Sequence, residues 1–80
     1  MEVRYDPDAD AIYVTFREPG ERVHSRNLGD WRRVVDYDET GKPVGVELLA
    51  VSTGLDLDGL PEAEAIGAAI RSFPRLEAQS

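Results

Sequence analysis

Hydrophobic and polar residues alternate along much of the first fifty positions, which is the pattern of β-strands with one buried face. Ile12, Val14 and Phe16 fall on one side of an extended chain, and the residues between them fall on the other. Turn-forming residues such as Pro19-Gly20 and Gly29-Asp30 separate these stretches. The pattern predicts five strands, over residues 3–5, 11–16, 21–28, 31–37 and 43–51.

The spacing changes near residue 60, where apolar residues begin to recur every three or four positions. This period predicts a helix over residues 61–73. Pro61 suits the first helical position, Glu62 and Glu64 suit the first turn, and Pro74 ends the segment. The apolar face of the predicted helix consists of Ala63, Ile66, Gly67, Ile70 and Phe73.

Strands followed by one helix predict an α+β fold: a small antiparallel sheet of about five strands, formed by hairpins or a meander, with the C-terminal helix packed on one face. Residues 1–80 form a single domain, divided into sheet (1–52), connector (53–60), helix (61–73) and tail (74–80). The covered face is expected to collect Val3, Tyr5, Ile12, Val14, Phe16, Val44, Val46, Leu48, Ile66, Ile70 and Phe73.

Two loops carry acidic residues in turn positions. Asp6, Asp8 and Asp10 lie around Pro7 at a spacing that is also found in calcium-binding loops. An EF-hand loop beginning at Asp6 would, however, need Gly at position 11 and Glu at position 17. Ala11 and Arg17 stand there instead, so we predict a solvated turn and no metal site. Residues 38–42 predict a short hairpin loop with Gly41 at positive φ.

Composition and charge narrow the functional classes. The chain has 80 residues, a net charge of −7 and no cysteine. The absence of cysteine removes thiol chemistry and fits a cytoplasmic protein, and the chain has no apolar run long enough to cross a membrane. The negative charge disfavours non-specific binding to nucleic acid or anionic lipid. Residues 17–33 nevertheless form a basic island with five arginines and three acids.

A single helix cannot cover five strands, so we expect the outer sheet face or an edge strand to bind a partner. A homo-oligomer, most simply a dimer, is the favoured assembly, and a small basic protein is an alternative partner. The basic island could also contact nucleic acid, or could form cross-strand ion pairs with Glu2, Glu18 or Glu47. The candidate interaction surface comprises Tyr13, Arg22, His24, Arg26, Trp31, Arg33, Glu47, Leu49 and Val51.

Two motifs resemble a known family. Tyr5-Asp6-Pro7-x-x-Asp10-x-x-Tyr13-Val14, followed by Val35-Asp36-Tyr37-Asp38-x-x-Gly41-x-x-Val44-Gly45-Val46-Glu47-Leu48, is similar to the small prokaryotic family called domain of unknown function 2283. The resemblance spans residues 1 to about 52 and implies a short, cytoplasmic protein without established catalytic residues. Some members are encoded beside small candidate toxins, which implies an antitoxin-like or partner role.

No catalytic constellation emerges from the sequence. His24 is the only histidine, and Ser25 beside it would point to the opposite side of a strand. We therefore assign no catalytic, cofactor or metal-binding residue, and we predict a protein–protein interaction module. The alternatives are a nucleic-acid binder that uses the Arg22–Arg33 region and a carboxylate-based enzyme, for which acids from different segments would have to converge.

Overall fold

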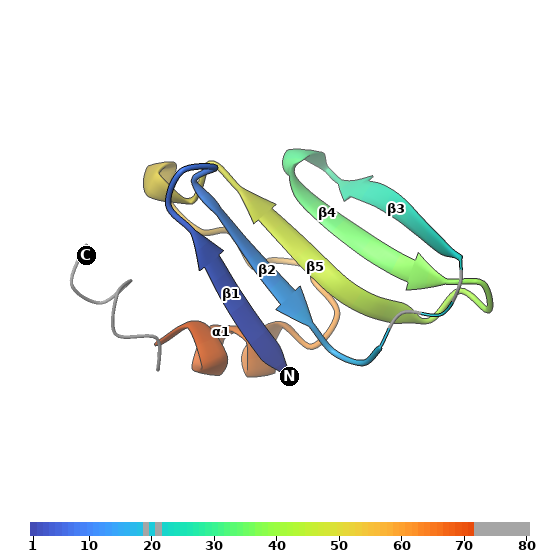
Figure 1. The fold of residues 1–80 in the computed structure, drawn as a ribbon. Coiled ribbons are helices and arrows are strands. Elements are labelled where there is room, and N and C mark those ends of the chain that lie inside the picture. Colours follow the sequence, from blue (N-terminus) through green and yellow to red (C-terminus); the bar gives the residue numbers. More distant parts are fainter. Residues whose placement is uncertain (19, 21, 72–80) are drawn as a thin grey trace.

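The computed structural model describes residues 1–18, 20 and 22–71, and within them it confirms the α+β fold. Five antiparallel strands form one sheet, and one α-helix lies on one face of it (Figure 1). The elements are β1 (Glu2–Asp6), β2 (Ala11–Thr15), β3 (Val23–Leu28), β4 (Asp30–Asp38), β5 (Pro43–Leu49), the 3-10 helix η1 (Val51–Thr53) and α1 (Ala63–Arg71).

The strand order is β1-β2-β5-β4-β3. The pairs β1–β2, β3–β4 and β4–β5 are hairpins between consecutive strands, as the turns in the sequence predict. A plain meander would place β3 beside β2, but β5 lies there instead and pairs with β2 over the full length of that strand. The central strand is therefore β5, and the two edges are β1 and β3.

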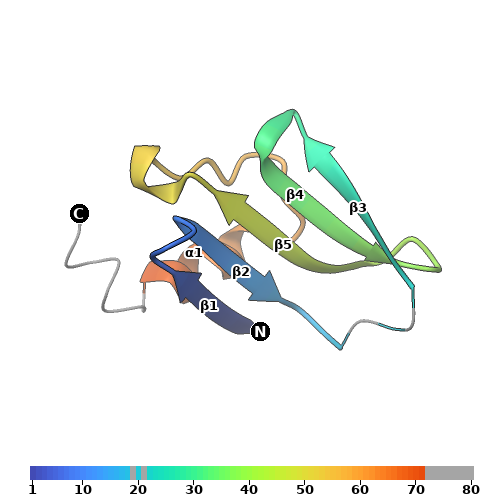
Figure 2. The same ribbon diagram turned by 45° about the horizontal axis from the view of Figure 1, so that its top comes forward.

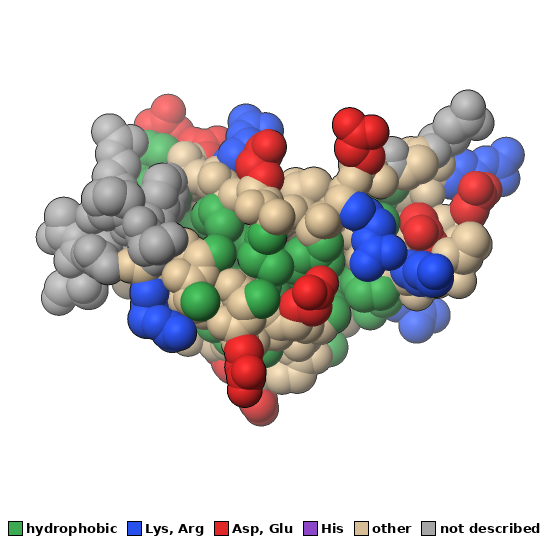
Figure 3. Space-filling model, turned by 90° about the horizontal axis from the view of Figure 1, so that it is seen from below, with side chains coloured by type: hydrophobic (Ala, Val, Ile, Leu, Met, Phe, Trp, Pro, Cys, Tyr) green, Lys and Arg blue, Asp and Glu red, His purple; other side chains and the backbone are tan. Residues whose placement is uncertain are grey.

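The hydrophobic core lies between the sheet and the segment that contains α1 (Figure 2). Ile66 is completely buried, and burial of such a side chain contributes about 1.5–3 kcal/mol. The sequence pattern missed Val35 and Leu60, and the predicted Phe73 lies outside the described residues. Seen from below, hydrophobic side chains lie in the middle of the molecule with charged ones around them (Figure 3). The buried cluster consists of Ile12, Val14, Val35, Val46, Leu48, Leu60, Ile66 and Ile70.

Of the predicted element boundaries that differ from the structure, the end of β5 and the start of α1 each lie next to a residue with left-handed backbone. Ala50 has φ 53°, which ends β5 at Leu49 and turns Val51 into η1 instead of continuing the strand. Glu62 has φ 54°, so α1 begins at Ala63 and not at Pro61. A right-handed helix or a strand cannot continue through such a residue. The predicted helix end and the tail over 74–80 lie outside the described residues.

The loop predictions agree with the structure. Asp6 Oδ1 accepts hydrogen bonds from the backbone N–H groups of Asp8 and Ala9, which fixes the first turn. Asp10 reaches across to η1, where its carboxylate accepts bonds from the backbone and hydroxyl of Ser52. Gly41 has φ 88°, as predicted for the second hairpin loop. The carboxylates of Asp6 and Asp10 thus have structural partners on the protein itself.

Candidate functional site

The face of the sheet opposite α1 is the candidate interaction surface, and the strand register shows which residues lie on it. Arg4 pairs with Tyr13, Tyr13 pairs with Glu47, and Glu47 pairs with Val34. Directly paired residues share a face, so these four form one row across β1, β2, β5 and β4. We call this face, which also carries the neighbouring row from Glu2 to Asp36, the outer face.

A glycine creates a hollow in the middle of the outer face. A Cβ atom at Gly45 would lie only 2.8 Å from the carbonyl oxygen of Val14, so β2 and β5 approach closely at this point. A hollow of about 460 Å³ opens above it, bordered by side chains of all five strands, among them Arg4, Tyr13 and Ser25. The outer face is therefore concave, which suits contact with a protruding side chain of a partner.

Two carboxyl groups converge on this hollow from different strands. Asp36 pairs with Gly45 and Val34 pairs with Glu47, so Asp36 and Glu47 are diagonal neighbours on one face. Burial raises the pKa of Glu47, and the charge of Asp36 and a hydrogen bond with its side chain raise it further. Ser25 Oγ donates a hydrogen bond of 2.5 Å to Asp36 Oδ1. This pair resists full ionisation, and a nearby cation would relieve the repulsion.

Three residues of the predicted interaction surface lie on the outer face. Tyr13, Glu47 and Leu49 are half-buried there, and the register confirms that the first two are directly paired. Val51 is misplaced in the prediction, since the turn at Ala50 directs it to the other side, where it packs against the core.

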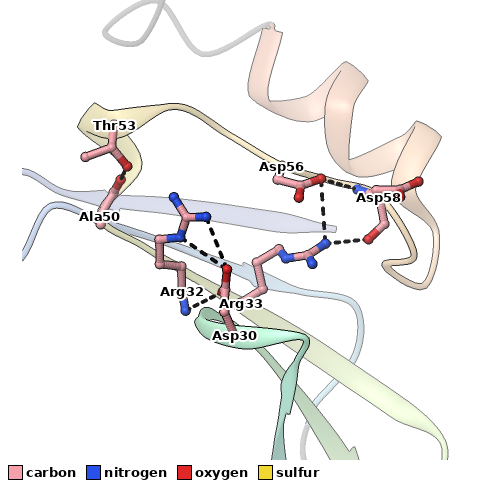
Figure 4. A network of polar contacts seen from close by, with 7 residues as sticks. All are labelled: Asp30, Arg32, Arg33, Ala50, Thr53, Asp56 and Asp58. Carbon is pink, nitrogen blue, oxygen red and sulfur yellow. Dashed lines mark hydrogen bonds and ion pairs between the residues drawn. The ribbon is translucent and has the colours of Figure 1, made fainter.

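The predicted basic island divides into paired and unpaired arginines. Arg33 Nη1 donates a hydrogen bond of 2.5 Å to the backbone oxygen of Asp58 and lies 3.7 Å from the Asp56 carboxylate (Figure 4). The backbone N–H of Arg32 donates to Asp30 Oδ1 at 2.9 Å, and its guanidinium donates to Asp30 Oδ2 at 3.1 Å. These two bonds, the backbone one foremost, lower the pKa of the Asp30 carboxyl. Arg32 therefore stabilises the start of β4, and Arg33 links β4 to residues 56–58 in the segment before α1.

The other basic residues lie on β3, or just before it, on the face opposite to Glu47. His24 pairs with Tyr37 and Arg26 pairs with Val35, a core residue, so these two point to the side that carries α1. Arg22 has the same parity and, like them, is exposed. The side chains of these three residues make no hydrogen bond or ion pair with another described residue. The expected cross-strand ion pairs with glutamates therefore do not form among the described residues.

Trp31 also belongs to the predicted surface, and it is 62% exposed near the start of β4. It flanks Arg32 and Arg33, which are engaged in the contacts above, so it does not extend a row of free arginines. The predicted surface is thus split between the two sides of the sheet: Tyr13, Glu47 and Leu49 lie on the outer face, whereas His24, Arg26 and Arg33 lie on the side of α1.

Sequence reasoning missed Arg4, Asp36 and Gly45. The first could have been found, because the tight turn at Asp6–Asp10 fixes Arg4 opposite Tyr13. The proximity of Asp36 and Glu47 could have been predicted from the register of the hairpin formed by β4 and β5 alone. His24 lies on the opposite face from this carboxyl pair, so it is not a catalytic partner for it. In the described part of the chain no three acidic or histidine side chains gather as metal ligands would.

No helix in the described part of the chain is long and apolar enough to cross a membrane. Searches of curated proteins and of solved structures returned no match. A family model does match: the model described as protein of unknown function (DUF2283) aligns with residues 2–52, which contain all five strands. The chain therefore belongs to the DUF2283 family.

Proposed function

We propose that this protein is an interaction module that forms a homodimer through its outer face. The observation that carries the proposal is the row Arg4–Tyr13–Glu47, which places a cation and an anion on either side of an aromatic ring on the face that α1 leaves uncovered. Such a row is complementary to itself after a twofold rotation, which is the symmetry of most homodimers.

The strand order gives the geometry of this dimer. A twofold axis parallel to β2 and in front of Tyr13 exchanges the positions of β1 and β5, because these strands flank β2. Arg4 of each copy then faces Glu47 of the other, and the two tyrosines meet at the axis. An axis through the central strand would instead place Glu47 against its own copy, so charge complementarity selects the axis at β2.

Two consequences follow for the strength of the dimer. Only three strands of each copy overlap, so the buried area is smaller than that of a standard interface. We therefore expect a dissociation constant in the micromolar and not the nanomolar range. The partner's Arg4 would also relieve the repulsion between Glu47 and Asp36. If the biological partner is instead a small basic protein in the cytoplasm, as an antitoxin-like role implies, its cations would use the same hollow.

Charge exchange tests the proposal. In sedimentation equilibrium at micromolar concentration, Arg4→Glu and Glu47→Arg should each lose the dimer that the wild type forms, because each homodimer would bring like charges together. An equimolar mixture of the two variants should recover the dimer, since both contacts are then attractive. Arg71→Glu, which makes the same charge change on an exposed residue of α1, on the other side of the sheet, is the control. A strictly monomeric wild type, or a mixture that stays monomeric, would refute the homodimer.

A further inference from the structure

The edge strand β3 is the most exposed regular element of the described chain. Five of its six residues are exposed, and only Leu28 packs against the core. β3 is hydrogen-bonded to β4 on one side, and no strand of the described residues lies on its other side. One side of its backbone therefore presents unpaired N–H and C=O groups, which can pair with an added strand.

Natural edge strands are usually protected against such pairing by proline, a central bulge or a covering loop. β3 contains no proline, and its one irregularity lies at its end, between Asn27 and Leu28. Its protection is charge, from Arg22, His24 and Arg26 at alternating positions on one side. An antiparallel copy of β3 centred on Ser25 would bring Arg26 against His24, so a second copy of this strand is disfavoured.

From the free edge and its unpaired cations we propose that β3 is a strand-addition site for an extended acidic segment of another protein. Alternating carboxylates in the added strand would lie on the same face as Arg22, His24 and Arg26, and its backbone would continue the sheet. Figure 3 shows Lys and Arg side chains gathered toward the end of the molecule where β3 and β4 lie. Beside them lies a shallow hollow lined by His24, Arg26, Tyr37, Asp38, Glu39 and Gly41. Its two carboxylates oppose its two basic groups, so the free edge and the exposed cations of β3, and not this hollow, carry the proposal.

Backbone hydrogen bonds between the added segment and β3 distinguish strand addition from simple electrostatic adsorption, so the first experiment tests these bonds. The probe is the blocked peptide acetyl-Thr-Glu-Val-Glu-Val-Glu-Thr-amide, with its affinity measured by fluorescence polarisation and its site by backbone amide NMR shifts. Alternate amides of an added strand point toward β3, so only the Glu amides or only the Thr and Val amides can bond to it. One peptide is therefore N-methylated at every Glu and a second at every Thr and Val. One of the two should lose binding, and the other should still bind. Amides of β3 should also gain protection from hydrogen exchange.

The charge component is tested with matched variants. The double variant Arg22→Glu/Arg26→Glu should weaken peptide binding at least about tenfold, because two attractive cross-strand pairs become repulsive. Arg71→Glu, an exposed change on α1 away from β3, should bind within about twofold of the wild type, whereas the matching single change Arg26→Glu should bind more weakly than that. The same measurements on Arg4→Glu show whether the site works without the proposed dimer.

Three outcomes would overturn the proposal. The first is equal binding of both N-methylated peptides, which would indicate adsorption without strand addition. The second is a set of NMR shifts that avoids β3. The third is tighter binding of a short oligothymidine that competes with the peptide, which would assign the cations to nucleic acid.

Discussion

The substitution Gly45→Ala tests the close approach of β2 and β5 that forms the hollow of the outer face. The new Cβ would lie 2.8 Å from the carbonyl oxygen of Val14, and real Cβ atoms essentially never come this close to another heavy atom. That oxygen belongs to a strand paired on both sides, so it cannot move without disturbing β1 as well. Overpacking of this kind costs about 1–3 kcal/mol.

An opposing effect reduces the expected loss. Glycine in a strand is itself unfavourable by about 0.5–1 kcal/mol relative to alanine, so the net destabilisation should be about 0–2.5 kcal/mol, centred on about 1 kcal/mol. Urea denaturation followed by circular dichroism measures it, and the melting temperature should fall by about 4–8 °C per kcal/mol. Gly20→Ala is the control, because no atom lies within 4 Å of its Cβ position. A Gly45→Ala midpoint above that of the wild type would refute the close approach.

Three further predictions concern the core, a turn and the carboxyl pair. Ile66→Asp should unfold the domain, seen as loss of the circular dichroism signal, because it places an unpaired charge in the core. Gly41→Val should cost about 1 kcal/mol or more in urea denaturation, since φ is 88° there and β-branched residues resist positive φ; an unchanged midpoint would contradict this. Asp36→Asn should lower the pKa of Glu47 in an NMR titration but leave it above 4.5, because burial, the larger cause, remains; an unaltered titration would disprove the contact.

The local parts of the fold were predictable because each rests on neighbours in the sequence. The hairpin at Gly41 and the first turn at Asp6 follow from backbone preferences of the residues themselves. The apolar spacing of Ile66 and Ile70 follows from the helical period. Each of these signals lies within a few residues, so no knowledge of the sheet was needed.

The remaining features depend on contacts between distant segments. Nothing in the sequence indicates that β5 inserts beside β2, yet this pairing places Glu47 next to Tyr13 and defines the outer face. Ala50 and Glu62 adopt positive φ although neither residue type favours it, so the ends of β5 and α1 could not be predicted. Arg33 was assigned to a binding surface because its partners, including Asp56, lie in a connector distant in sequence.

The proposed dimer would assign stability to one side of the sheet and recognition to the other, and this separation can be measured. The core residues stabilise the fold from the side of α1, whereas Arg4 and Glu47 lie on the outer face and have no place in that core. The pKa of Glu47 is raised in the folded monomer, so ionisation of this group lowers the free energy of unfolding. This loss of stability is absent below pH 4.5 and develops as the pH rises through the folded pKa of Glu47. The partner's Arg4 would favour that ionised form, so the dimer binds fewer protons than two monomers. Dimerisation should therefore strengthen as pH rises through the pKa of Glu47, while the stability of the Arg4→Glu monomer changes in the opposite direction with respect to this group.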